Sequence, residues 1–307
     1  MNAINTALRI FFLSQIIVGT VGNSFFFCLY IITFLFGPKL RPIDLLFSHL
    51  AFVNDLVLLS KGIPQTMSTF GLKNFLDDVG CKLVFYLHRV ARSLSRSTTC
   101  LLTGFQAITI SSGSYRWTEF KEKFTKFIVP SCLFCWTFHL LINIILLMYI
   151  RGPKGSKNTT EIHDFIYCSF SFQSSFGILM YVFIFSLPDI ICVGIIVSTS
   201  IYMVFALKKH FQTVKYVHGS SVNSRVSPEP RATQTILLLV STFVTFYSLN
   251  SILAVYMHYR KSQLWMVHMS VFLAACFPAC SPFVLIISDS QVPKYCLVLW
   301  RKIRPPP

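Results

Sequence analysis

The sequence lacks the motifs that commonly mark the catalytic site of an enzyme. It has no H-E-x-x-H metal motif, no glycine-rich phosphate loop and no Ser-His-Asp set. Cys132 and Cys135 have the spacing of a metal or redox pair, but their surroundings are apolar and contain no second pair that would complete a zinc site. We therefore expect no enzymatic activity, no bound metal and no cofactor.

Linkers, low-complexity segments and internal repeats are also absent. Many transporters are built from repeated halves, with acidic residues at the membrane midplane that relay ions. The absence of such repeats disfavours a small-solute transporter or channel. That reading remains as an alternative from a different functional class.

Charged residues are scarce, at 12% of the chain, and long stretches contain none. The run Ile10–Phe36 has no charged residue, and about 20 apolar helical residues cross the ~30 Å hydrocarbon core of a bilayer. Further apolar stretches are Ile43–Ile63, Leu83–Ser111, Phe127–Ile150, Phe176–Leu207, Ala232–Tyr259 and Leu264–Ser288. A chain of this size cannot enclose so much apolar surface in a soluble core. We expect an all-α membrane protein with a single seven-transmembrane-helix domain over residues 1–307.

Acidic residues number only 11 against 27 lysines and arginines, giving a formal charge of +16. The basic residues lie mostly in the connectors, with about twice as many on one side of the membrane as on the other. The positive-inside rule then places the amino terminus outside the cell and the carboxyl terminus in the cytosol. The sequon at Asn158 falls in a loop that this topology places outside, so we expect glycosylation there. The basic surface is expected to meet lipid headgroups at the plasma membrane, and no nucleic acid.

Two of the ten cysteines fall on the predicted outer side. Cys81 precedes the third apolar stretch, and Cys168 lies in the outer loop that contains the sequon. Both face an oxidising compartment, where a bridge between them would tie the loop over the bundle. Seven helices with such a disulfide indicate a G-protein-coupled receptor.

Short motifs along most of the chain narrow this class. They are Leu40–Leu45 (LRPIDL), His49–Asn54 (HLAFVN), Leu58–Pro64 (LLSKGIP), Ala91–Ser93 (ARS), Ser97–Leu102 (STTCLL), Phe105–Ser111 (FQAITIS), Thr235–Ser241 (TILLLVS) and Ser281–Ile286 (SPFVLI). These segments resemble the signatures of type 1 vomeronasal receptors. The resemblance implies a pheromone-type chemosensory receptor that binds a small molecule and activates an inhibitory-class heterotrimeric G protein. A bitter-taste-type receptor is an alternative, although it would not be expected to carry the Cys81 and Cys168 pair.

The sequence departs from rhodopsin-like receptors at the inner end of the third helix. Where those receptors have Asp-Arg-Tyr, this chain has Thr109-Ile110-Ser111, so the ionic lock is missing. The sixth stretch, Ala232–Tyr259, contains no proline or glycine that would kink it. The details of rhodopsin activation therefore do not transfer to this chain.

The third helix carries Arg89, Arg92 and Arg96, which share roughly one helical face. Charges that face lipid cost several kcal/mol, roughly, so these side chains should face the bundle interior. One interpretation is that they line a cavity, formed by helices three, five, six and seven, for a ligand with acidic, sulfate or carbonyl groups. The other is that Asp189 and Asp55 neutralise them as structural ion pairs. Tyr247 and Asn250, in the outer half of the sixth helix, are expected to line the same cavity.

Overall fold

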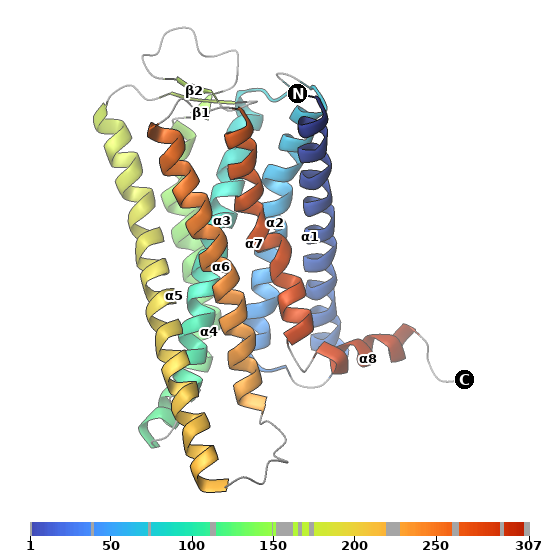
Figure 1. The fold of residues 1–307 in the computed structure, drawn as a ribbon, viewed down its shortest axis with the longest axis vertical. Coiled ribbons are helices and arrows are strands. Elements are labelled where there is room, and N and C mark those ends of the chain that lie inside the picture. Colours follow the sequence, from blue (N-terminus) through green and yellow to red (C-terminus); the bar gives the residue numbers. More distant parts are fainter. Residues whose placement is uncertain are drawn as a thin grey trace.

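The structure is a computed structural model, which describes residues 2–37, 40–72, 75–110, 115–148, 150–151, 162–164, 168–171, 175–218, 228–259, 264–288 and 292–303. Within these residues, seven long helices stand side by side, and a shorter eighth helix projects sideways from one end of the bundle, past the first helix (Figure 1). Three short strands cover the opposite end. The predicted all-α, seven-helix bundle is confirmed.

The long helices extend past most of the predicted apolar stretches. They are α1 (Asn2–Phe36), α2 (Pro42–Thr69), α3 (Asp78–Ile110), α4 (Tyr115–Asn143), α5 (Ser175–His218), α6 (Pro228–Tyr259) and α7 (Leu264–Ser288), followed by α8 (Val292–Ile303). The added residues at the helix ends are polar or mixed in character. A helix can continue beyond the hydrocarbon region because its backbone hydrogen bonds remain satisfied there.

The fourth predicted stretch differs from the structure at its end. We placed that end at Ile150, whereas α4 ends at Asn143 and is followed by a 3-10 helix, η1 (Ile144–Met148), and by strand β1 (Ile150–Arg151). Ile150 is fully buried and pairs with Phe170 of strand β3 (Ser169–Ser171). The sequence stays apolar through this change of conformation, and hydropathy alone does not separate a continuing helix from a 3-10 helix and a short strand.

Large apolar side chains cover the outside of the bundle, as expected of helices that contact lipid. On α5, for example, Phe183 and Phe205 are 64% and 67% exposed. Six of the described helices are long and apolar enough to cross a membrane, namely α1, α2, α4, α5, α6 and α7. Such surfaces would be an aggregation hazard in water and are favourable in hydrocarbon.

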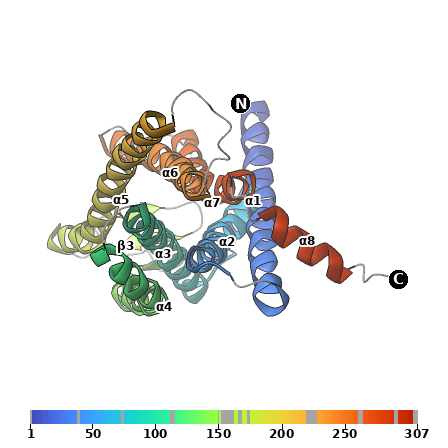
Figure 2. The same ribbon diagram turned by 90° about the horizontal axis from the view of Figure 1, so that it is seen from below.

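The third helix is not among these six, because its arginines and a run of polar residues make it less apolar. It nevertheless lies inside the bundle, between α2, α4 and α5 (Figure 2). Every residue from Ser93 to Thr99 is buried. Other helices shield α3 from lipid, so its polar side chains find protein partners rather than hydrocarbon.

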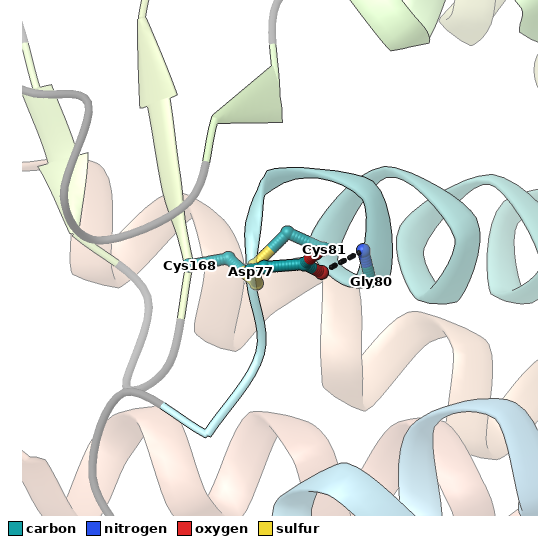
Figure 3. Close-up of a disulfide and its surroundings, with 4 residues drawn as sticks. All are labelled: Asp77, Gly80, Cys81 and Cys168. Atoms are coloured by element: carbon teal, nitrogen blue, oxygen red, sulfur yellow. Dashed lines mark hydrogen bonds between the residues drawn. A yellow bond between two sulfur atoms is a disulfide. The ribbon is translucent and has the colours of Figure 1, made fainter.

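The end of the bundle opposite α8 is closed by a small antiparallel sheet. Strand β3 lies between β1 and β2 (Ile162–Asp164), and Cys168, just before β3, is bonded to Cys81 of α3. Asp77 caps the start of α3, four residues before Cys81, since its Oδ1 accepts a hydrogen bond from the backbone N–H of Gly80 at 2.7 Å (Figure 3). The predicted disulfide is confirmed, and it fixes the sheet to the start of α3.

Polar side chains also connect the helices near the bundle centre. Asn54 of α2 donates to Ser281 Oγ of α7 at 2.8 Å and accepts from Ser95 Oγ of α3 at 2.7 Å. Asn23 of α1 donates to the backbone oxygen of Pro278 at 2.8 Å. These bonds satisfy buried polar groups and join α1, α2, α3 and α7 in one register.

At the other end, a buried carboxylate fixes α8 to the bundle. Asp44 Oδ2 accepts from Tyr295 Oη of α8 at 2.6 Å, and Asp44 Oδ1 forms an ion pair with Arg41 at 2.6 Å. Asp44 and Tyr295 are 0% and 3% exposed, so their hydrogen bond is shielded from water, whereas the Arg41 side chain of the ion pair is 32% exposed. Because Asp44 lies in the first turn of α2, its charge also favours the positive end of that helix.

Candidate functional site

A small cavity lies between α2, α3, α6 and α7. Its volume, measured for water-sized probes, is about 40 Å³, which is room for only a few water molecules. Its polar lining consists of Arg92, Ser95, Arg96, Tyr247 and Asn250. Four of the six residues predicted from the sequence to bind ligand therefore meet at one place.

The deeper arginine has a carboxylate partner. Arg96 Nη2 lies 2.6 Å from Asp189 Oδ1 of α5, and the two side chains are 7% and 21% exposed. Arg96 Nη2 also donates to Ser93 Oγ at 3.2 Å. Asp189 therefore does not line the cavity directly, and it contributes by neutralising Arg96 and tying α5 to α3.

The second carboxylate that we considered does not pair with an arginine. Asp55 of α2 accepts a hydrogen bond from Ser24 Oγ of α1 at 2.8 Å, and it does not line the cavity. Among the described residues, no basic group lies within ion-pair distance of Asp55. Of the two proposed ion-pair partners, only Asp189 has this role.

Arg92 is held by a neutral group instead. When the Asn250 amide is oriented to satisfy both its ends, its oxygen accepts from Arg92 Nη2 at 3.1 Å. The amide nitrogen then donates to the backbone oxygen of Ser270, at 2.9 Å, and to its Oγ, at 3.0 Å. Ser270 of α7 thus orients Asn250 of α6, which orients Arg92 of α3. No carboxylate among the described residues lies within ion-pair distance of Arg92.

Further positive charge surrounds Arg92. Lys61 of α2 and the neighbouring Arg89 and Arg96 all lie close enough to repel it electrostatically. Lys61 and His88 line a second cavity of about 10 Å³, which shares Val57 with the first. Among the described residues that these interactions join, Asp189 is the one carboxylate near Arg92, Arg96 and Lys61, so this part of the site has an excess of positive charge that favours an electron-rich ligand.

Aromatic rings form the opposite wall. The rings of Phe243 and Tyr247 stack with centroids 5.7 Å apart, and Phe243 meets Phe277 of α7 edge to face at 5.0 Å. Phe243 and Phe277 are buried in the bundle core. The cavity thus combines a cationic side from α3 with an apolar side from α6 and α7, an arrangement suited to a small amphiphilic molecule.

Arg89 does not line the cavity, although the helical periodicity placed it on the same face. Asn158, the predicted glycosylation site, lies outside the described residues. We expected α5 to line the ligand cavity with α3, α6 and α7, whereas α2 lines it through Val57, and α5 contributes only Asp189, which pairs with the lining residue Arg96.

Besides Ser95, which lines the cavity, sequence reasoning missed three residues of this region. Lys61 is an ionisable residue inside a predicted span, and that position was itself a signal. His139 carried the same signal, since it lies in the predicted span Phe127–Ile150, whereas Ser270 carried none. His139 is 5% exposed, and its Nε2 lies 2.7 Å from Ser97 Oγ, which joins α4 to α3 beside the Arg96 and Asp189 pair. Within the described residues, no group of three or more histidine, cysteine or acidic residues is arranged to hold a metal.

Comparisons with known proteins give consistent results. A profile of the vomeronasal organ pheromone receptor family matches residues 6–298. Vomeronasal type-1 receptor 1 of Homo sapiens is 46% identical over 286 residues, which cover 93% of this chain and 81% of that receptor. Vomeronasal type-1 receptor 4 of Homo sapiens is 42% identical over 291 residues, covering 94% and 96%.

A more distant relative and a solved structure extend the comparison. Olfactory receptor class A-like protein 1 of Danio rerio is 29% identical over 283 residues, covering 92% of this chain and 89% of that protein. The crystal structure of squid rhodopsin superimposes with a TM-score of 0.73 at 17% identity, covering 99% of this chain and 82% of that chain. At that identity, the likeness to rhodopsin concerns the fold.

Proposed function

Because the chain belongs to the vomeronasal organ pheromone receptor family, we propose that it is a chemosensory receptor that binds a small ligand in the cavity beside Arg92. Ligand binding favours an arrangement of the inner helix ends that activates an inhibitory-class heterotrimeric G protein. The ligand carries an acidic, sulfate or carbonyl group for Arg92 and an apolar body for the aromatic wall.

The observation that carries this proposal is the difference between Arg92 and Arg96. Arg96 is neutralised by Asp189 at 2.6 Å, whereas the partner that the structure gives Arg92, among the described residues, is the neutral Asn250 amide. A half-buried cation outside ion-pair distance of a carboxylate is incompletely neutralised, and a ligand oxygen would stabilise it with a charge-assisted hydrogen bond. Because the cavity admits only a few waters, the ligand enters as side chains around it shift.

The proposed orientation places the amino terminus and the sheet outside the cell, and α8 and the carboxyl terminus in the cytosol. The Cys81 and Cys168 bridge supports it, because disulfides form on the oxidising side of the membrane. The exposed Lys126 and Lys208 then lie near the inner surface, where they meet anionic lipid headgroups or the G protein.

Substitution at Arg92 tests the proposal. Volatile and steroidal panels are first screened on cells that express the receptor, and the active compound with the lowest half-maximal concentration becomes the probe. Arg92→Ala should raise that concentration by about tenfold or more, because a hydrogen bond to a charged group contributes ~1.5–3 kcal/mol. Surface expression, measured by antibody labelling of an amino-terminal epitope, should change little.

Asn250→Leu is the companion variant, since it removes the group that orients Arg92 and should shift potency in the same direction by a smaller factor. Wild-type potency in Arg92→Ala, at matched surface expression, would contradict the assignment. Purified receptor in vesicles separates the transporter alternative: ligand should stimulate nucleotide exchange on the G protein without solute flux.

A further inference from the structure

A buried hydrogen bond joins α3 to α6 in the half of the bundle nearer α8. Gln106 Nε2 of α3 donates to Thr233 Oγ1 of α6 at 2.9 Å. The two side chains are 2% and 1% exposed. Gln106 lies one turn before the Thr109-Ile110-Ser111 segment, the place where the sequence lacks an ionic lock.

The surroundings of this hydrogen bond are apolar. Leu102 and Phe105 of α3, Met203 of α5, and Ile236 and Leu239 of α6 belong to one buried cluster around the inner half of the bundle. In such an environment a hydrogen bond is electrostatically stronger than in water, and no solvent replaces a lost partner. Gln106 and Thr233 can therefore exchange their mutual bond for water only if α3 and α6 move apart.

The position of α6 makes this one contact important. Its most extensive packing is against α7, and its packing against α3 is much smaller (Figure 2). Residues 232–259 of α6 contain no proline or glycine, so the helix lacks a hinge of that kind and its inner end moves with the rest of the helix.

We propose that the Gln106 and Thr233 hydrogen bond is a neutral latch that holds the inner ends of α3 and α6 together without ligand and thereby sets basal signalling. This inference rests on the proposed function, because the latch regulates the same ligand-to-G-protein coupling. Gln106 and Thr233 are positioning residues, and neither contacts the ligand. A latch without charge takes the place of the missing ionic lock.

The first experiment measures basal nucleotide exchange on an inhibitory-class G protein by purified receptor in vesicles, without ligand. Thr233→Val keeps the side-chain shape and removes the hydroxyl, which leaves Gln106 unsatisfied only when the helices are closed. Basal exchange should rise on the order of three- to tenfold. Thr233→Ser retains the hydroxyl and should stay near wild type.

Two further variants sharpen the test. Basal exchange in Gln106→Leu/Thr233→Val should be close to that of the more active single variant, because both single changes remove the same bond between α3 and α6. Thr103→Val is the matched control, since its hydroxyl is buried on α3 and, among the described residues, donates to Cys100 O of the same helix, at 2.9 Å. Wild-type basal exchange in Thr233→Val and Gln106→Leu, or an equal rise in Thr103→Val, would overturn the latch.

The second experiment does not depend on a G protein. Spin labels on noncanonical residues at the exposed positions Lys126 of α4 and Gln234 of α6 report the distance of the inner end of α6 from α4 in nanodiscs. Thr233→Val should increase the population at longer distance, and Thr233→Ser should not. If Thr233→Val lengthens the distance but the receptor stimulates exchange on no G protein, the latch stands and the proposed function is refuted. If wild type stimulates exchange but the distance is unchanged in both Thr233→Val and Gln106→Leu, the latch alone is refuted.

Discussion

Arg92 and Arg96 are four residues apart on one helix and have different roles. Arg96 forms an ion pair with Asp189 across the gap between α3 and α5, and Arg92 is oriented by Asn250. The difference follows from depth, because one helical turn displaces a side chain by about 5.4 Å along the axis. The structural role therefore falls to the deeper arginine, and the binding role that we propose falls to the shallower one.

Removal of one member of the buried pair should reduce folded receptor at the cell surface. Asp189→Leu leaves Arg96 as an uncompensated buried charge, which typically costs ~3–5 kcal/mol. Combination with Arg96→Met should restore much of the surface level, because an apolar pair of similar volume often replaces a buried ion pair at little cost. Flow cytometry of an amino-terminal epitope measures the surface level of wild type, of each single variant and of the double variant.

The exposed pair of Lys82 and Asp78 on the same helix provides the control. Their side chains lie 2.8 Å apart and are 35% and 51% exposed. Exposed pairs contribute about 0–1 kcal/mol, so Lys82→Met should leave surface expression near wild type. If the surface level of Arg96→Met/Asp189→Leu is no higher than that of the worse single variant, the two residues do not act as an isolated ion pair.

At this scale the sequence predicted the kind of site better than its pairing. Helical spacing placed the arginines toward the bundle interior, and Arg92 and Arg96 do line the cavity. Which arginine meets Asp189 depends on how far α5 is displaced along its axis relative to α3, and nothing in the local sequence of either helix specifies that displacement. Ser270 could not be found for the same reason, because its role exists only once α6 and α7 are packed together.

At the scale of elements, close approach of helices depends on small residues. A methyl group at Gly19 of α1 would lie 2.8 Å from Ala279 Cα of α7 and 2.8 Å from Leu58 Cδ1 of α2. The first of these is a backbone atom, so a rotamer change cannot relieve the clash. Gly19 therefore permits α1 to pack directly on α2 and α7.

Gly19→Ala should lower the thermal unfolding temperature of the purified receptor in detergent, because overpacking typically costs about 1–3 kcal/mol. Gly194 of α5 is the contrasting position, since no atom lies within 4 Å of the added methyl group. Gly194→Ala should raise the unfolding temperature slightly, as alanine in a helix is favoured over glycine by roughly 0.5–1 kcal/mol. Equal temperatures for the two variants would contradict this account of the α1 contacts.

The ends of elements were predicted less well than their existence. Apolar stretches located all seven long helices, yet the end of α4 was placed at Ile150 instead of Asn143. A helix that leaves the hydrocarbon region and a buried strand share the same apolar composition, so the boundary is set by the pairing of Ile150 with Phe170. That pairing brings together residues from separate segments, which periodicity does not reveal.

For the whole molecule, the proposed function requires one orientation in the membrane, with the amino terminus outside the cell. Asn158 should carry a glycan when the receptor is expressed in mammalian cells, because its loop would face the secretory lumen. Glycosidase treatment should then shift the protein on a gel, and Asn158→Gln should abolish the shift. An amino-terminal epitope accessible only after permeabilisation would reverse the orientation that we propose.

The polar character of α3 also affects how the receptor is made. On a scale derived from translocon insertion, each arginine near the centre of a helix opposes entry into the bilayer by about 2.5–3.5 kcal/mol. With three arginines and a run of buried serines and threonines, α3 is a poor candidate for independent release into lipid during synthesis. We therefore expect α3 to stay beside α2 and α4 until α5 emerges from the ribosome and supplies Asp189. On this account, a late helix completes the insertion of an early one.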